Sequence, residues 1–155
     1  WTQDLKIGGG RILGEAIHFI DLIRYLFNCK ISSWKSSNFI GTSLDTCSII
    51  LNGEDGSIGN INYFSNGSNE YQKENIILSV NGKMAVLDNF KSIKFYSWPQ
   101  AKNKTLISQN KGNFECVLNF LQSIKNLEKP LISFNEIYEV TKIAIEIANN
   151  KSDVL

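Results

Sequence analysis

The one histidine of the chain, His18, is the side chain best suited to proton transfer at neutral pH. It follows a run of three glycines, residues 8–10, and stands near the start of a segment with helical apolar periodicity. A histidine in the first turn of a helix lies at the positive end of the helix dipole, which favours the neutral imidazole that accepts a proton. Two interpretations are open: His18 is an acid–base group beside a cleft, or a polar residue of an ordinary amphipathic helix.

The glycine run does not have the pattern of a nucleotide-binding loop. A dinucleotide fingerprint that starts at Gly8 needs a third glycine where Leu13 stands, and no strand is predicted before it. A P-loop needs Gly-Lys-Ser/Thr, whereas Gly14 is followed by Glu15. We therefore expect the glycines to let the backbone turn sharply, or to approach a ligand or another segment closely.

The composition predicts one globular domain over residues 1–155, with 43% hydrophobic residues and a net charge of +1. Because no block of like charge occurs, nothing points to a nucleic-acid or membrane-surface partner. The longest apolar runs fall far short of the ~20 residues that span a bilayer. Cys29, Cys47 and Cys116 form no C-x-x-C pair, which predicts reduced, buried thiols of a cytoplasmic protein and no metal site.

The order of the predicted elements is one helix, a run of strands and two further helices. Apolar periodicity predicts the first helix over residues 15–27. Runs rich in β-branched and aromatic residues predict strands over residues 31–40, 44–51, 57–64, 75–80, 84–87 and 93–98. Asn81-Gly82 predicts a tight hairpin turn. Of the last two helices, one lies between residues 114 and 127, and the other opens at a capping box of Ser133 and Glu136.

This order predicts an α+β fold with a mostly antiparallel open sheet and helices packed on one face. The strands must be largely antiparallel, because a parallel crossover needs a dozen or more residues and these connections are short. The other face of the sheet must be solvated or covered by a partner. We expect a homo-oligomer that uses this open face, because a soluble monomer rarely exposes a large apolar surface.

Two long segments carry a resemblance to a known family. Residues 8–26 read GGGRILGEAIHFIDLIRYL, which resembles the start of the C-terminal domain of the Gfo/Idh/MocA oxidoreductases, the glucose–fructose oxidoreductase and inositol dehydrogenase family. Residues 60–93 read NINYFSNGSNEYQKENIILSVNGKMAVLDNFKSI, which resembles the later sheet strands of a subgroup of that family. The resemblance implies a C-terminal substrate and oligomerisation domain over residues 1–155, without the N-terminal Rossmann domain.

The resemblance also implies a chemistry. Members of the family pass a hydride between NAD or NADP and the hydroxyl carbon of a sugar or cyclitol, while a histidine or lysine handles the hydroxyl proton. By resemblance His18 matches the histidine of the C-terminal motif. Many relatives carry an aspartate four residues earlier, where this chain has Gly14, and the adjacent Glu15 is the candidate replacement. We expect no dinucleotide bound to this domain alone, and no activity without the Rossmann half.

Three further polar residues are candidates for binding a sugar-like substrate: Arg11, Asn66 and Lys73. Arginine and lysine suit a carboxylate or a nucleotide-sugar phosphate. The alternative is that Lys73 and Glu74 form a solvated strand edge and that Asn66 is a turn residue. For the whole chain the alternative function is a non-catalytic α+β binding or dimerisation module that has kept the fold and lost the chemistry.

Overall fold

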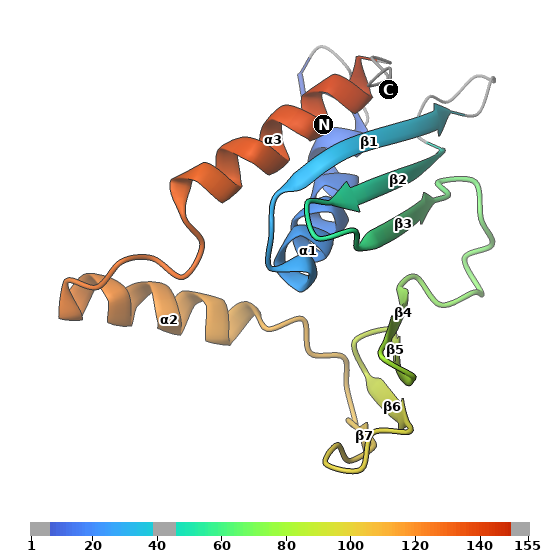
Figure 1. Cartoon of the computed structure of the whole chain (residues 1–155), viewed down its shortest axis with the longest axis vertical. Coiled ribbons are helices and arrows are strands. Elements are labelled where there is room, and N and C mark those ends of the chain that lie inside the picture. Colours follow the sequence, from blue (N-terminus) through green and yellow to red (C-terminus); the bar gives the residue numbers. More distant parts are fainter. Residues whose placement is uncertain (1–6, 39–45, 150–155) are drawn as a thin grey trace. The chain divides into compact units, whose positions relative to one another are not determined.

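The computed structural model describes residues 7–38 and 46–149. The chain forms two compact units, one from Trp1–Asn66 with Leu131–Leu155 and one from Gly67–Pro130. The first unit therefore combines two stretches of the chain that are separated in sequence by the second unit, and Figure 1 colours their described parts blue to green and orange to red. Each unit is described by itself.

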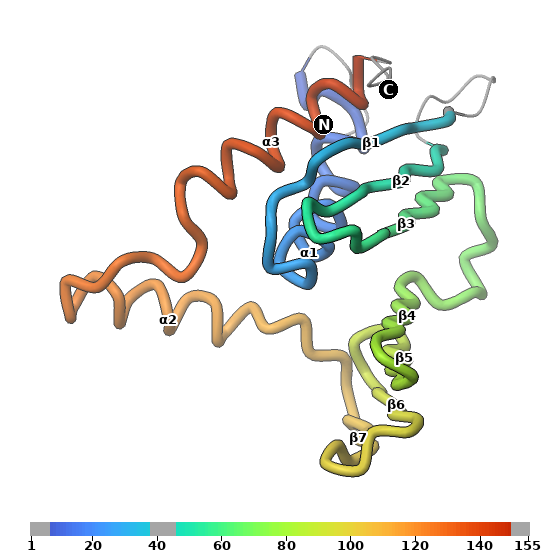
Figure 2. The backbone as a smooth tube through the Cα atoms, viewed as in Figure 1, coloured from blue at the N-terminus to red at the C-terminus, as the bar shows by residue number. Residues whose placement is uncertain are grey.

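A three-stranded antiparallel sheet with two helices on one face makes up the first unit. The sheet has the order β1 (Ile31–Asn38), β2 (Cys47–Gly53), β3 (Ile58–Tyr63). A π-helical turn, η1 (Ile12–Ala16), leads into α1 (Ile17–Phe27), which packs beside α3 (Phe134–Ala148) (Figure 2). Antiparallel pairing and helices on one face confirm the α+β expectation for this unit.

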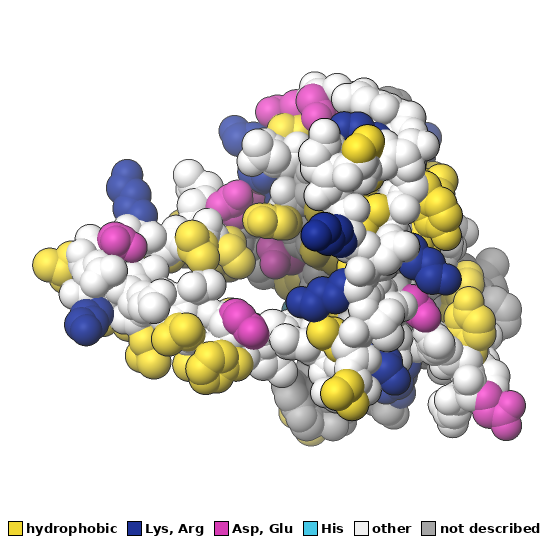
Figure 3. Space-filling view, turned by 90° about the horizontal axis from the view of Figure 1, so that it is seen from below, with side chains coloured by type: hydrophobic (Ala, Val, Ile, Leu, Met, Phe, Trp, Pro, Cys, Tyr) yellow, Lys and Arg dark blue, Asp and Glu magenta, His cyan; other side chains and the backbone are white. Residues whose placement is uncertain are grey.

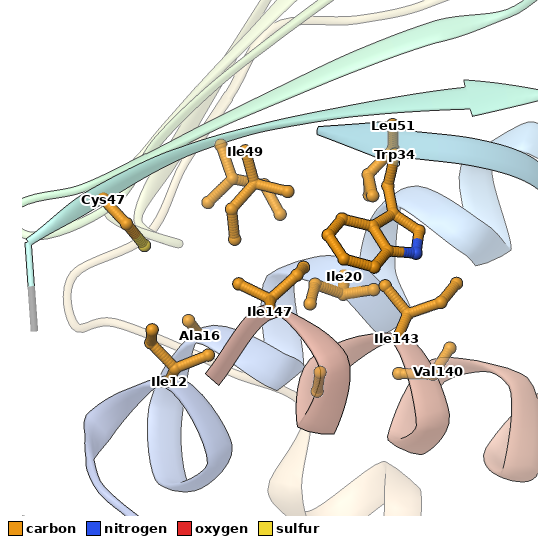
Figure 4. Close-up of a cluster of buried hydrophobic side chains, with 12 residues drawn as sticks. Ile12, Ala16, Ile20, Trp34, Cys47, Ile49, Leu51, Val140, Ile143 and Ile147 are labelled. Atoms are coloured by element: carbon orange, nitrogen blue, oxygen red, sulfur yellow. The ribbon is translucent and has the colours of Figure 1, made fainter. Parts of the chain in front are cut away.

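The core of the first unit lies between the sheet and the two helices (Figure 4). Trp34 of β1 pairs in register with Leu51 of β2, and Ile49 lies two residues before Leu51 on the same face. Ile20 of α1 and Ile147 of α3 are fully buried against them. Each such side chain contributes about 1.5–3 kcal/mol on burial, so this apolar layer is the main stabilising element of the unit.

At Gly59 of β3, the helix α1 approaches the sheet closely. A Cβ atom at this glycine would lie 2.7 Å from Cγ2 of Ile23 and 3.2 Å from Cζ of Phe27. Real Cβ atoms essentially never show the shorter distance. The missing side chain of Gly59 therefore makes room for two apolar residues of α1.

The second unit contains a four-stranded antiparallel sheet and one helix. The strands are β4 (Asn75–Val80), β5 (Lys83–Asp88), β6 (Ser92–Tyr96) and β7 (Lys104–Thr105), in that order across the sheet. Asn81 and Gly82, with φ of 48° and 73°, form the predicted turn between β4 and β5. The helix α2 (Asn113–Asn126) has no buried residue.

The exposed side chains of α2 include a full apolar stripe. Figure 3 shows hydrophobic side chains gathered along this helix. At least two-fifths of each of these side chains is accessible to solvent: Phe114, Val117, Leu118, Phe120, Leu121 and Ile124. Their spacing is that of an amphipathic helix whose apolar side faces solvent in this structure.

The structure differs from the sequence-based expectation in three respects. The strands divide between two sheets where one open sheet was expected, because the Ser/Asn/Gly-rich residues 65–74 form turns and bends that end the ladder after β3. The strand expected from residue 44 begins at Cys47, and residues 39–45 lie outside the described residues. Of the thiols, which are all free, Cys47 is buried as expected, whereas Cys29 is half-buried and Cys116 exposed.

No helix in the described part of the chain has both the length and the hydropathy needed to cross a membrane.

We expect Gly59→Ala to lower the free energy of unfolding by about 1–3 kcal/mol, because the new methyl group would overlap Ile23. Asn60→Ala, at an exposed neighbouring position on β3, should change it by less than about 0.5 kcal/mol. Urea denaturation followed by circular dichroism measures both. Equal midpoints for the two variants would contradict the close approach of α1 to β3.

Candidate functional site

The glycine run turns the chain into its first helix. Gly9 and Gly10 have φ of +72° and +86°, in the left-handed region that side chains rarely adopt. The carbonyl oxygen of Gly10 accepts a hydrogen bond from the backbone N–H of Gly14 at 3.0 Å, which starts the helix. The expected sharp turn is confirmed.

The first helical turn is wider than an α-helical one. In η1 the backbone N–H of Ile17 donates to the carbonyl oxygen of Ile12, an i→i−5 bond. Such π-turns occur frequently at functional sites. The sequence predicted His18 in the first turn of the helix. This was wrong, because η1 precedes α1 and His18 lies inside a continuous helix. The dipole argument therefore loses its force for His18, since the effect falls off within the first turn.

A cluster of half-buried polar groups, here called the η1–β3 cluster, joins Arg11, Glu15 and Tyr63. The hydroxyl of Tyr63 donates to Oε2 of Glu15 at 2.6 Å. Tyr63 ends β3 opposite the buried Cys47 and packs against the core. Burial, followed by the bond to Glu15, raises the pKa of Tyr63 to about 12, and the guanidinium of Arg11 acts in the opposite direction.

His18 is exposed on α1, and Asp21 is half-buried one helical turn later. Burial raises the pKa of the Asp21 carboxyl above its usual value. The charge of His18 is the largest effect that opposes this rise, and the charge of Arg24 is a smaller one, whereas Glu136 of α3 adds to it. His18 and Asp21 are thus electrostatic neighbours at the edge of the interface between α1 and α3.

Arg24 ties α1 to α3 through two carboxylates. Its Nε lies 3.2 Å from Oε2 of Glu139, and its Nη2 lies 3.8 Å from Oε1 of Glu136. The second oxygen of Glu139, Oε1, accepts the backbone N–H of Ile31 at 2.6 Å. Glu139 therefore connects the end of α1, the start of β1 and the middle of α3, a role that sequence analysis did not predict.

The structure brings some of the predicted site residues together. Arg11 and Glu15 meet at Tyr63, which the sequence analysis missed. Asn66 is exposed in the turn three residues after Tyr63, which agrees with the turn-residue alternative. Lys73 is exposed in the second unit. Its neighbour Glu74 is not simply solvated, as the strand-edge alternative assumed, because its Oε1 pairs with Nζ of Lys111 at 2.5 Å.

Two kinds of site were considered for the described residues: a metal centre, and a pyrophosphate site at the glycine run. No three His, Cys, Asp or Glu side chains within residues 7–38 and 46–149 are placed to hold a metal ion. Beside the glycine run, Cδ1 of Leu13 lies 2.7 Å from where a Cβ of Gly9 would stand. An apolar side chain thus fills the space next to the loop, which does not fit a pyrophosphate.

Comparisons with known proteins give one family model and several solved structures of similar fold. A family model described as "Oxidoreductase family, C-terminal alpha/beta domain" matches residues 1–140. A dehydrogenase from Clostridium difficile aligns with a TM-score of 0.74 and 20% identity, over 90% of this chain and 48% of that chain. UDP-N-acetylglucosamine 3-dehydrogenase from Acidithiobacillus ferrooxidans aligns with a TM-score of 0.70 and 13% identity, over 88% and 45%.

A third similar structure was solved with its ligands. The WlbA dehydrogenase from Bordetella pertussis, in complex with NADH and UDP-GlcNAcA, aligns with a TM-score of 0.50 and 14% identity, over 88% of this chain and 44% of that one. At such identities the likeness shows the fold alone. The chain spans about half the length of these proteins. None of the curated proteins matches it in sequence.

We expect Tyr63→Phe to lower the free energy of unfolding by about 1–2 kcal/mol at pH 7, because the carboxylate of Glu15 loses its hydrogen-bond donor. The hydroxyl of Tyr63 keeps its proton up to a higher pH in the folded chain than in the unfolded chain. Its contribution to the free energy of unfolding is therefore complete below pH 10 and is lost as the pH rises through about 12.

Denaturant titrations of the wild type and Tyr63→Phe between pH 7 and pH 12 measure this difference. Tyr71→Phe, at a tyrosine that is 75% exposed in the second unit, is the matched control and should behave as the wild type. A constant difference across the whole pH range would contradict the bond between Tyr63 and Glu15.

Proposed function

Because the chain belongs to the Gfo/Idh/MocA oxidoreductase family and matches its C-terminal alpha/beta domain, we propose that it is the substrate-binding and oligomerisation domain of an NAD(P)-dependent oxidoreductase. The proposed substrate is a hydroxyl of a sugar, nucleotide sugar or cyclitol. Two observations support this class: one similar structure is a UDP-N-acetylglucosamine dehydrogenase, and another holds NADH and UDP-GlcNAcA. The observation that carries the proposal is His18, on the helix that follows the left-handed glycine turn.

In the proposed reaction His18 accepts the proton of the substrate hydroxyl while the hydride leaves the same carbon, so that the alcohol becomes a carbonyl. The dinucleotide, bound by a Rossmann domain outside these 155 residues, would take up the hydride. This chain supplies the general base and the surroundings that hold the sugar. Alone, it is proposed to bind no dinucleotide and to be inactive. Its proposed location is the cytoplasm.

The proposed substrate contacts lie near the end of β3. Arg11 belongs to the η1–β3 cluster and Asn66 follows the same strand, and both are proposed to contact sugar hydroxyls or a phosphate. Glu15 supports this end of the site through its bond to Tyr63. Lys73, exposed in the second unit, is proposed as a ligand on the chemistry of its side chain alone.

His18→Ala should lower kcat of the full-length oxidoreductase about 10²–10⁴-fold, the usual contribution of one general acid–base group. His18→Asn keeps a hydrogen-bonding tip but exchanges no proton near neutral pH, so it should be nearly as damaging. Both should retain the wild-type melting temperature, because His18 is exposed. Steady-state kinetics with a panel of nucleotide sugars and cyclitols measures the loss.

The same kinetics separates the alternative function. Gly14, in place of the aspartate of many relatives, favours a non-catalytic binding module. Such a module would show no turnover in the wild type with any substrate of the panel. Normal turnover of both His18 variants would instead show that the base is another group.

Oligomerisation is proposed to use an exposed sheet face. The sheet face away from the helices in the first unit is mostly serine and asparagine, with Ile50 and Ile58 exposed. In the second sheet, Ile77, Met84 and Tyr96 share one face and are all exposed. This face is more apolar than the face of the first sheet that points away from the helices. We therefore assign the contact between copies to this second face.

Ile77→Lys should dissociate the oligomer, since it places a charge in the apolar contact. Ile58→Lys is the matched control, because the two isoleucines are 65% and 69% exposed and lie in different sheets. Sedimentation velocity over a concentration series reads the result. A wild-type chain that stays monomeric throughout, or a control that dissociates while Ile77→Lys does not, would contradict the assignment.

A further inference from the structure

The second unit holds a cavity of about 170 Å³, here called the β6–β7 hollow. Three of its lining residues form a row across the sheet, because Leu87 of β5 pairs with Ile93 of β6, which pairs with Lys104 of β7. Phe90 and Leu106 line it as well, and the surface that it exposes is mostly apolar. Leu87 and Ile93 lie on the sheet face opposite to the one assigned to the contact between copies.

Backbone hydrogen bonds hold the residues around the hollow in place. The N–H of Leu106 donates to the carbonyl oxygen of Lys91 at 2.8 Å, and the N–H of Asn110 donates to that of Phe90 at 3.1 Å. The segment after β7 is therefore tied to the turn between β5 and β6, and both segments line the hollow. A site that is formed before binding loses less entropy when a ligand enters.

Phe90 has an unusual backbone conformation for a bulky residue. Asn89 and Phe90 both have φ of 48°, within a turn that the N–H of Lys91 closes by donating to the carbonyl oxygen of Asp88 at 2.9 Å. Such turns favour glycine at the place of Phe90, where a large side chain is strained. The ammonium of Lys111 lies 5.8 Å from the centre of the Phe90 ring. Strained residues occur frequently at ligand sites, where their surroundings hold them.

The charged lining residues of the hollow are both cations. Lys91 and Lys104 are exposed and contribute to the lining, whereas no aspartate or glutamate does. Within residues 7–38 and 46–149, neither lysine takes part in an ion pair. The hollow thus combines an apolar surface with two ammonium groups that are available to an anion.

We propose that the β6–β7 hollow binds a small flat anion with an apolar body, namely a single aromatic ring that bears a carboxylate. A cavity of about 150 Å³ lined by Leu, Ile and Phe accepts benzene, so the hollow has room for one ring. The carboxylate pairs with Lys91 or Lys104, while the ring covers Leu87, Ile93 and Leu106. A phosphate ion leaves this apolar surface wet, and a neutral ring leaves the two cations without a partner. The proposal is independent of the function proposed above, because it uses no residue of α1 or of the η1–β3 cluster.

Benzoate is the probe that tests this site, in a titration of the isotope-labelled 155-residue chain followed by NMR. The backbone amides of Ser92, Leu106 and Asn110 should shift and saturate, with a dissociation constant on the order of 1 mM, as suits so small a ligand. Benzyl alcohol lacks the charge and inorganic phosphate lacks the ring. Each should therefore bind at least about fivefold more weakly than benzoate.

Variants of the lysines test the recognition of the charge. Lys91→Met and Lys104→Met keep an unbranched side chain without the ammonium, and should weaken benzoate binding about threefold each and about tenfold together. Lys102→Met is the matched control, because Lys102 is exposed in the same unit and does not line the hollow. It should bind benzoate as the wild type does. Leu106→Trp should fill the hollow and abolish the saturable shifts while both lysines remain.

Three results would overturn the proposal. The first is the absence of saturable shifts with benzoate in the wild type. The second is equal binding of benzyl alcohol or of phosphate, which would show that the charge or the ring plays no part. The third is a loss of affinity in Lys102→Met as large as that in Lys104→Met, which would reduce the effect to the net charge of the chain.

Discussion

The close contact between α1 and the helix-facing side of β3, at Gly59, is the constraint on which the candidate site depends. With hydrogen in place of a side chain at this position, Ile23 and Phe27 can lie directly against the strand. Once that contact is made, the start of the helix falls beside the end of β3. Only then can Glu15 reach Tyr63 and form the η1–β3 cluster. A packing requirement of the core thus determines where the polar groups meet.

Local chemistry made much of the fold predictable. The strand over residues 75–80 was predicted with the bounds that β4 has, since the Asn81-Gly82 turn that follows it tolerates positive φ. The capping box also formed as predicted, with Glu136 N–H donating to Ser133 Oγ at 3.3 Å and Ser133 N–H donating to Glu136 Oε2 at 2.8 Å. Signals of this kind depend on residues within one turn of each other, so a single sequence contains them.

The candidate site was only partly predictable, because its contacts are distant in sequence. Glu15 was singled out from its place beside Gly14, but its partner Tyr63 is 48 positions away and had no signal of its own. The pairing of Arg24 with Glu139 spans 115 positions. The π-turn that moves His18 into the helix interior depends on how η1 packs, and no periodicity reveals it.

The first unit is assembled from both ends of the chain, and this has a consequence for the order of folding. Ile20 and Ile49 are synthesised before Ile143 and Ile147, which cover them and belong to α3. At about 5–20 residues per second, the ribosome makes the whole second unit before that cover exists. The second unit has only local strand pairings, whereas the first unit must bring α3 back to η1, α1 and β1 across a long stretch of sequence. Half-made chains therefore expose an apolar sheet face for several seconds, and a nascent chain of this kind is a natural client for chaperones.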